Sequence, residues 1–152
     1  MKVSIDKYPN KGEQKISVRI DPWDTWSMDH TLAHIIVPML KQLRSNLHGA
    51  PFVHDEDVPE ELKSTSASPK ENEWDIDDNH FKRWDWVLDE MIFAFESKLE
   101  DWDDKFYKYE DDPNEELGIK LVWMDDEGHK AYQERIKNGF RLFGKYYEGL
   151  WD

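Results

Sequence analysis

Two histidines, His30 and His34, stand one helical turn apart in a stretch whose apolar spacing predicts a helix. That spacing brings both imidazoles to one helix face, as in the histidine pair of zinc-dependent proteases. The glutamate that acts as base in that motif is absent, because Thr31 occupies its place. A metal would need further ligands from elsewhere, such as His54 or Asp55. We therefore predict no bound metal or cofactor, and two surface histidines are the simpler interpretation.

Three carboxylates, Asp85, Asp89 and Glu96, lie on one flank of a second predicted helix, beside its apolar stripe. Neighbouring carboxylates at the edge of a core can raise one another's pKa and act as acid and base, or bind a hard cation. Together with the histidine pair, they would be the catalytic residues of a metal-dependent hydrolase. The nearby bases Lys82 and Arg83 offer ordinary ion pairs instead, so this flank also has a structural explanation.

The last predicted helix carries positive charge along one face, with Glu134 among the bases. Ion pairs between Glu134 and its neighbours are one explanation. The alternative is a phosphate-binding strip for a small anionic ligand, such as a nucleotide signal, with tyrosines that stack on the base. The residues of this alternative site are Lys130, Lys137, Arg141, Lys145, Tyr146 and Tyr147.

Residues 96–116 contain ten acidic residues against three lysines, interleaved with aromatic residues. A solvated helix end is one interpretation. The other is a surface that mimics nucleic-acid phosphates and binds a basic groove on a partner protein, because complementary charge speeds encounter and selects the partner. The aspartates predicted to contact that partner are Asp101, Asp103, Asp104, Asp111 and Asp112.

Aromatic side chains away from the predicted core are the expected apolar anchors for the same partner. Trp86 and Phe93 lie far from the apolar stripe of their helix, and Trp102 lies within the acidic region. Indoles beside carboxylates often mark a contact surface. We therefore expect a second surface of this helix to be covered by the loop at 48–78, by a partner or by a second copy of the chain, which leaves a homo-oligomer open.

Hydrophobic periodicity predicts an α+β fold in a single domain of 152 residues. A long irregular acidic loop is expected at about 48–78. The strand at 119–124 is expected to join the N-terminal hairpin, and one face of that hairpin is expected to be buried. The predicted helices cover about 28–47, 79–109 and 127–148, and the predicted strands cover about 2–6, 15–20 and 119–124.

Composition excludes several classes of protein. The chain contains no cysteine, so disulfides, zinc–thiolate sites and cysteine nucleophiles are impossible. No apolar run approaches the length of about 18 residues that a membrane-spanning helix needs. The formal net charge of −14 argues against direct binding to nucleic acid or to an anionic membrane, since phosphate contacts need clustered lysine and arginine.

Five stretches resemble a family of small accessory proteins of tailed bacteriophages. They are residues 20–26 (IDPWDTW), 28–33 (MDHTLA), 48–53 (HGAPFV), 82–91 (KRWDWVLDEM) and 140–147 (FRLFGKYY). The resemblance implies a phage origin and expression in the cytoplasm of a bacterial host. It supplies no catalytic residues, because no activity is established for the family. Small phage accessory proteins commonly block or divert host systems, which favours an interaction function.

The leading hypothesis is therefore an acidic, non-enzymatic phage protein that binds a host protein with a basic surface and inhibits or redirects it. An anti-defence role, with the acidic region standing in for nucleic-acid phosphates, is one form of this hypothesis. The first alternative is a protein that binds a small anionic ligand or nucleotide signal. The second alternative is the metal-dependent hydrolase described above.

Overall fold

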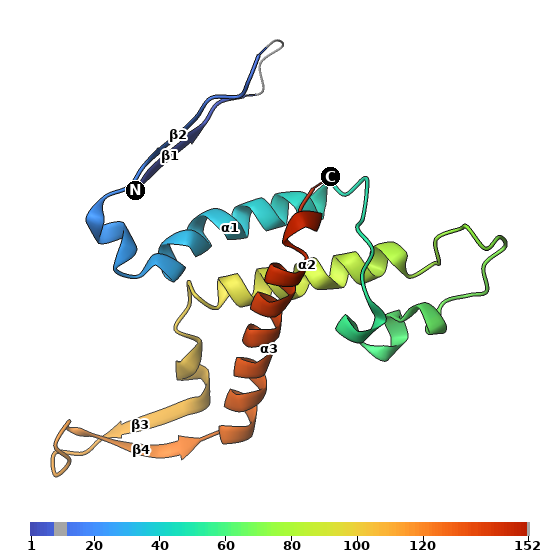
Figure 1. Ribbon diagram of the computed structural model, residues 1–152. Coiled ribbons are helices and arrows are strands. Elements are labelled where there is room, and N and C mark those ends of the chain that lie inside the picture. The colour runs from blue at the N-terminus through green and yellow to red at the C-terminus, as the bar shows by residue number, and fades with distance from the viewer. Residues whose placement is uncertain (8–11, 152) are drawn as a thin grey trace.

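Three helices form the body of the protein, and two β-hairpins project from it (Figure 1). We describe a computed structural model, in which residues 1–7 and 12–151 are placed. The helices are α1 (Met28–Ser45), α2 (His80–Glu96) and α3 (Asp126–Lys145). The α+β class predicted from the sequence is confirmed.

Helix α2 is the centre of the core. Its apolar stripe is buried between α1 on one side and α3 on the other, so that α2 contacts both of the other helices. Gly139 on α3 allows the closest approach, because a Cβ atom there would lie 2.3 Å from the carbonyl oxygen of Glu90 on α2. The fully buried residues of α2 include Trp84, Val87, Leu88 and Met91.

The predicted helix at 79–109 is too long, because α2 ends at Glu96. The Ser97 hydroxyl donates to the carbonyl oxygen of Ala94, and the backbone N–H of Leu99 donates to Glu96, which closes the helix with tighter turns. A short 3₁₀ helix, η5 (Trp102–Phe106), and then a strand follow. The apolar spacing continues past the end of α2 because the η5 aromatic residues pack against α3 rather than along α2.

The predicted three-stranded sheet is also wrong, because the structure has two separate antiparallel hairpins. Strand β1 (Lys2–Ile5) pairs with β2 (Ile16–Arg19), and β3 (Tyr107–Asp111) pairs with β4 (Ile119–Met124). The β4 strand finds its partner nearby in sequence, where loop closure costs little entropy. The intervening turn is held by the Asp112 side chain, which accepts hydrogen bonds from Asn114.

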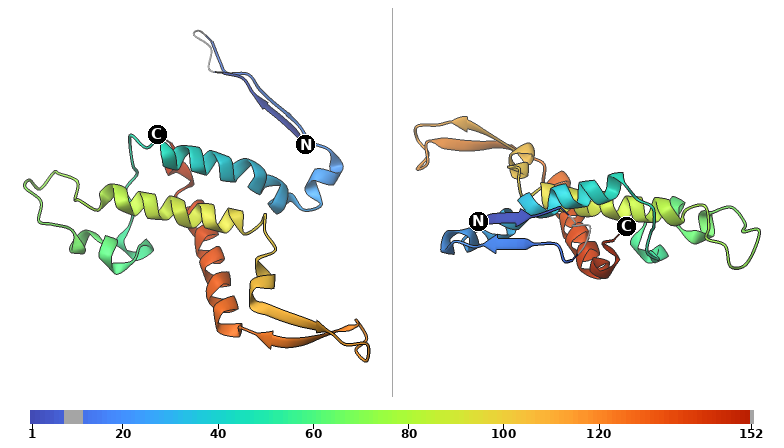
Figure 2. Two further views of the ribbon diagram at one scale, coloured as in Figure 1. Left: turned by 180° about the vertical axis from the view of Figure 1, so that it is seen from behind. Right: turned by 90° about the horizontal axis from the view of Figure 1, so that it is seen from above.

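The hairpin of β1 and β2 has no buried face, contrary to the sequence prediction. All eight of its strand residues are exposed. At the base of the hairpin, the N-terminal amino group pairs with Asp24 at 2.6 Å, in the 3₁₀ helix η1 (Pro22–Thr25). The left view of Figure 2 shows the hairpin extending away from the helices.

The loop at 48–78 contains three short 3₁₀ helices, η2 (Asp55–Asp57), η3 (Glu60–Leu62) and η4 (Ser64–Ser66). Another, η6 (Tyr147–Gly149), follows α3. The first half of the loop is anchored to the body, with Val53 and Val58 in the core. The tip is exposed, with Trp74 at 92%. The predicted irregular loop is therefore partly ordered by its contacts with α2 and α3.

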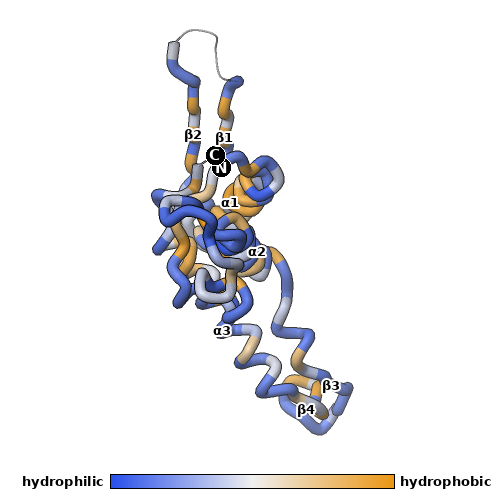
Figure 3. The backbone as a smooth tube through the Cα atoms, turned by 90° about the vertical axis from the view of Figure 1, so that its right-hand side faces the viewer, coloured by the Kyte–Doolittle hydropathy of each residue, from blue (hydrophilic) through white to orange (hydrophobic). Residues whose placement is uncertain are grey.

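The molecule is open in shape. Its accessible surface is 11402 Å², whereas a compact monomer of 18.3 kDa would expose about 8,100 Å². Both hairpins contribute to the excess, and Figure 3 shows hydrophobic segments on each of them, away from the helical body. Within residues 1–7 and 12–151, no helix is long and apolar enough to cross a membrane.

Candidate protein-interaction site

The histidine pair on α1 stands apart from the other side chains that the sequence suggested as metal ligands. The rings of His30 and His34 contact each other edge to face, 4.8 Å between centroids, and both residues are exposed. The two loop residues considered as further ligands, His54 and Asp55, do not join them, and Asp55 accepts hydrogen bonds from the backbone and hydroxyl of Ser64. No group of three or more metal-ligating side chains occurs in the described part of the chain.

The carboxylates on the flank of α2 pair with bases from α1. Arg44 lies 3.0 Å from both Asp85 and Asp89, and Lys41 lies 2.6 Å from Glu96. These ion pairs connect the two helices along their length. The predicted catalytic carboxylates therefore have a structural role in the helix packing, and within the described residues they are not part of a group of three or more side chains that could hold a metal ion.

The bases Lys82 and Arg83 do not form the surface ion pairs that the sequence predicted for them. Arg83 is buried and binds Asp77 with two hydrogen bonds of 2.7 and 2.8 Å. It also donates to the carbonyl oxygen of Leu62, so one guanidinium fastens both halves of the loop to α2. Lys82 donates instead to Asn79. The hydrogen bonds from Arg83 lower the pKa of the Asp77 carboxyl below its ordinary value.

The basic face of α3 is occupied by a carboxylate from the loop. Asp57 has a side chain only 1% exposed, and it lies 2.7 Å from Arg141 and 2.6 Å from Lys145. The Tyr146 hydroxyl donates to the same carboxylate at 2.5 Å. Burial alone would raise the pKa of Asp57, but the hydrogen bonds from Lys145, Tyr146 and Arg141 outweigh it and lower that pKa. Burial and the bond to Asp57 raise the pKa of Tyr146 to about 12.

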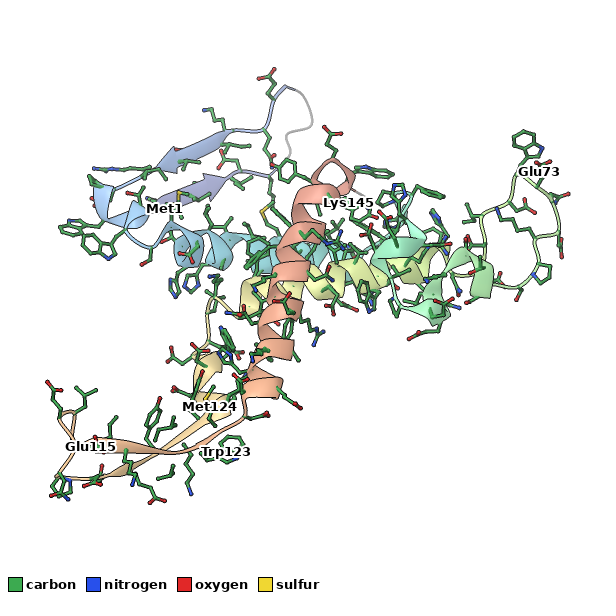
Figure 4. All side chains as sticks on the ribbon, turned by 60° about the horizontal axis from the view of Figure 1, so that its bottom comes forward. Met1, Glu73, Glu115, Trp123, Met124 and Lys145 are labelled. Atoms are coloured by element: carbon green, nitrogen blue, oxygen red, sulfur yellow. The ribbon has the colours of Figure 1, made fainter. Side chains whose placement is uncertain are left out.

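This arrangement changes the interpretation of the predicted anion-binding strip. The remaining two bases are also paired, Lys130 with Asp126 and Lys137 with Glu134. A phosphate would have to displace a protein carboxylate at each of the four bases. Figure 4 shows Lys145 at the end of α3 that faces the loop, where its carboxylate partners lie. Arg141 and Lys145 therefore bind the protein's own acidic loop, while Lys130 and Lys137 are paired within α3.

An apolar groove of about 540 Å³ lies between α1 and the segment after α3. None of the four bases of α3 lines it, and of the residues predicted for the anion-binding strip only Tyr147 does. Its lining is Ile36, Met39, Leu40, Leu43, Phe143, Tyr147 and Leu150.

The aromatic anchors predicted for a partner have contacts inside the protein. Trp102 stacks on Tyr132 of α3, 5.0 Å between ring centroids, and on His129 at 5.2 Å. Phe93 also contacts Tyr132 and lies under the guanidinium of Arg135 at 3.7 Å. The second surface of α2, which the sequence predicted to be covered, is thus covered in part by α3. Trp86 is half-buried against the core.

Beyond this aromatic cluster extends a segment that we call the acidic arm, residues 100–124, which contains η5, β3 and β4. It holds nine acidic residues and three lysines. Of the aspartates predicted to bind a partner, Asp103 lies 2.8 Å from His129 and Asp112 holds the turn before Asn114. Their side chains have intramolecular roles.

The remaining acidic side chains of the arm are available. In the described part of the chain, five exposed carboxylates of the arm form neither an ion pair nor a side-chain hydrogen bond. Figure 4 shows Glu115 at the far end of the arm and Trp123 nearer its base. The five are Asp101, Asp104, Asp111, Glu115 and Glu116.

The arm also presents apolar side chains. Those at 119–124 belong to the strand that was predicted to join the N-terminal hairpin. The strand pairing places Tyr109 beside Leu121 and Asp111 beside Ile119. Each of these four is exposed, Tyr109 at 51%. Trp123 is also 51% exposed, so the hairpin offers exposed aromatic side chains, whereas the predicted anchors Trp86 and Phe93 on α2 are partly covered. Alternation at 119–124 indicated the strand, but nothing in it indicated that the strand would project from the body.

Comparisons with protein families, with curated proteins and with solved structures find no match for this chain. The evidence for its function therefore comes from its own residues. Those residues place paired, structural charges in the body and unpaired acidic charges with exposed aromatic side chains on the arm.

Proposed function

We propose that this chain is a non-enzymatic, phage-encoded protein that binds a basic surface of a host protein through its acidic arm, and so inhibits or redirects that protein. The observation that carries the proposal is the combination of five unpaired carboxylates with exposed Tyr109, Leu121 and Trp123 on one projecting hairpin. Carboxylates steer a basic partner to the arm, and the aromatic and apolar side chains contribute the area that is desolvated on contact.

The open shape supports a binding function over catalysis. An enzyme encloses its reacting groups in a cleft, where water is excluded and charges are held in place. Here the candidate catalytic carboxylates Asp85 and Asp89 are both ion-paired with Arg44, and the excess exposed surface lies on projecting segments. The origin in a phage and the place of action in host cytoplasm are parts of the proposal that depend on the sequence resemblance.

The test is capture of host proteins by two variants with equal net charge. In the arm-neutral variant, the five unpaired carboxylates of the arm become amides. In the matched control, five exposed carboxylates elsewhere become amides. The arm-neutral substitutions are Asp101→Asn, Asp104→Asn, Asp111→Asn, Glu115→Gln and Glu116→Gln. The control substitutions are Glu61→Gln, Glu71→Gln, Glu73→Gln, Asp78→Asn and Glu148→Gln.

Tagged wild-type protein is expected to retain a host protein from bacterial lysate and to lose it as salt is raised, because exposed charge pairs are screened. The matched control should retain the same protein. The arm-neutral variant should lose it, with at least a tenfold weaker affinity by titration, or about 1.4 kcal/mol. Equal capture by both variants, with equal salt dependence, would refute the proposed role of the arm.

A further inference from the structure

The N-terminal hairpin of β1 and β2 has one exposed apolar face. Val3 pairs with Val18 and Ile5 with Ile16, so these four side chains share a face, while Lys2, Ser4, Ser17 and Arg19 occupy the other. Ile16 is 63% exposed. A two-stranded hairpin without a packed face is marginally stable in water. Packing of this apolar face against another surface would therefore stabilise the hairpin.

The same hairpin carries charge opposite to that of the chain. Residues 1–20 contain five basic and two acidic residues in a protein of net charge −14. The basic residues are Lys2, Lys7, Lys11, Lys15 and Arg19. Of these, the four that lie in the described part of the chain form no ion pair there, whereas the bases of the helices are nearly all paired.

The acidic arm complements this hairpin in charge and also has an exposed apolar surface. Its unpaired charge is negative, and its strands present Tyr109, Ile119 and Leu121 on one face, with Asp111 beside Ile119 at the distal edge of that face. Two twisted sheets that pack face to face lie about 10 Å apart and interdigitate such side chains. Lys2 and Arg19 start on the other face of the basic hairpin, but both of its strands are edge strands, so their long side chains can reach around the edge to the acidic side chains at the rim of the arm.

The two hairpins of one chain lie at separate places on the body, with α1 and α3 between them (Figures 1 and 2). We propose that two copies of this chain associate, with the apolar face of the basic hairpin of each copy packed on the apolar face of the acidic arm of the other. A twofold exchange uses both contacts at once and closes the assembly as a dimer. The surface in excess of a compact monomer, roughly 3,000 Å² by mass scaling, is ample for an interface of standard size.

This self-association uses the acidic arm but does not depend on the proposed host partner, because it requires only the purified chain. The two proposals interact in one respect. A copy whose arm is covered by a second copy cannot offer that arm to a host protein. Substitutions in the basic hairpin that weaken the dimer should therefore not weaken host capture, whereas the arm-neutral and arm-reversed variants should weaken both.

The test is sedimentation equilibrium of the full chain, with the tag removed, over a range of protein concentrations. A hairpin-reversed variant carries Lys2→Glu, Lys15→Glu and Arg19→Glu. An arm-reversed variant carries Asp111→Lys, Glu115→Lys and Glu116→Lys. A third variant combines all six substitutions, and a fourth removes apolar contact with Ile5→Ser and Val18→Ser. Circular dichroism checks that the helical body is unchanged.

The wild type should form a dimer that weakens with added salt. Either charge reversal alone should raise the dimer dissociation constant at least tenfold, or about 1.4 kcal/mol, and the combined variant should restore dimerisation, since opposite charges again face each other. The Ile5/Val18 variant should dissociate even at low salt. A monomer at every concentration, or a dimer that none of the variants weakens, would overturn the inference. Failure of the combined variant to recover would overturn the pairing of these two surfaces.

Discussion

The acidic loop at 48–78 and the acidic arm differ in how their carboxylates are paired. We call the loop carboxylates Asp57 and Asp77, together with Arg141 and Arg83 that bind them, the loop clamp. In the loop clamp, Asp57 and Asp77 are nearly buried and each is held by arginine. In the arm, Asp104 and Asp111 are exposed and have no charged partner in the described part of the chain. Both regions are irregular or weakly periodic in sequence, and both are rich in acidic residues.

The difference shows that acidic composition alone does not identify a binding surface. A buried carboxylate must be paired and hydrogen-bonded, because the cost of desolvating an unpaired charge is several kcal/mol. An exposed carboxylate has no such requirement, so it can keep its charge available to a partner. The loop clamp therefore stabilises the fold, while the arm contributes little to stability and is free to carry a function.

The largest expected effect on stability comes from breaking the loop clamp at Arg83. Arg83→Met keeps the apolar stem but leaves the Asp77 carboxylate and the carbonyl oxygen of Leu62 buried without their donor. We expect the free energy of unfolding to fall by about 3–5 kcal/mol. Urea denaturation followed by circular dichroism measures it. Lys82→Met, on the exposed side of the same turn, should change stability by less than about 0.5 kcal/mol.

The next largest effect on stability is expected when the pH is lowered. The pKa values of Asp57 and Asp77 are lowered in the folded state, so the stability they contribute is complete above the ordinary carboxyl value of 3.8 and is lost as the pH falls through the lowered values. Asp57→Asn should lower stability at neutral pH by about 2–3 kcal/mol and flatten the acid limb of the melting-temperature profile. Asp104→Asn should leave that limb as in the wild type, and a matching change there would contradict the contrast between clamp and arm.

The three helices were predictable because their apolar stripes face the core. Residues 28–47 and 127–148 were predicted within a few residues of α1 and α3. The end of α2 was not predicted correctly, because Trp102 and Phe106 continue the apolar spacing of α2 but contact α3. The pairing of β4 was missed because alternation gives a strand its face but not its partner.

The candidate sites were predictable only where charge is exposed. Asp101, Asp104 and Asp111 stand out in the sequence as part of an acidic run, and they are exposed in the structure. The partner of the basic face of α3 was not predictable, since Asp57 lies 84 residues before Arg141. The acidic run at 55–57 was the one available signal, because clustered carboxylates in a loop need either solvent or bases.

A smaller effect on stability is expected at the base of the arm, where the arm meets α3. Trp102→Ala removes the stacking on Tyr132 and His129 and should cost about 1–2 kcal/mol, since Trp102 is only half-buried. Hydrogen exchange should quicken in residues 107–124 more than in α2. Trp123→Ala, on the exposed part of the arm, should have little effect on either measurement. Equal quickening across α2 would show that the arm and the body unfold as one unit.

The arm-neutral variant should show the smallest effect on stability, although it is the variant expected to weaken host binding most. The arm-neutral variant loses five negative charges that have no partner, so the self-repulsion of a chain with net charge −14 decreases. Its free energy of unfolding should stay within about 0.5 kcal/mol of the wild type, as should that of the matched control. Urea denaturation of the three proteins at low salt measures this. A loss of more than about 1 kcal/mol confined to the arm-neutral variant would mean that these carboxylates hold the hairpin in place, and the arm would then resemble the loop clamp instead of differing from it.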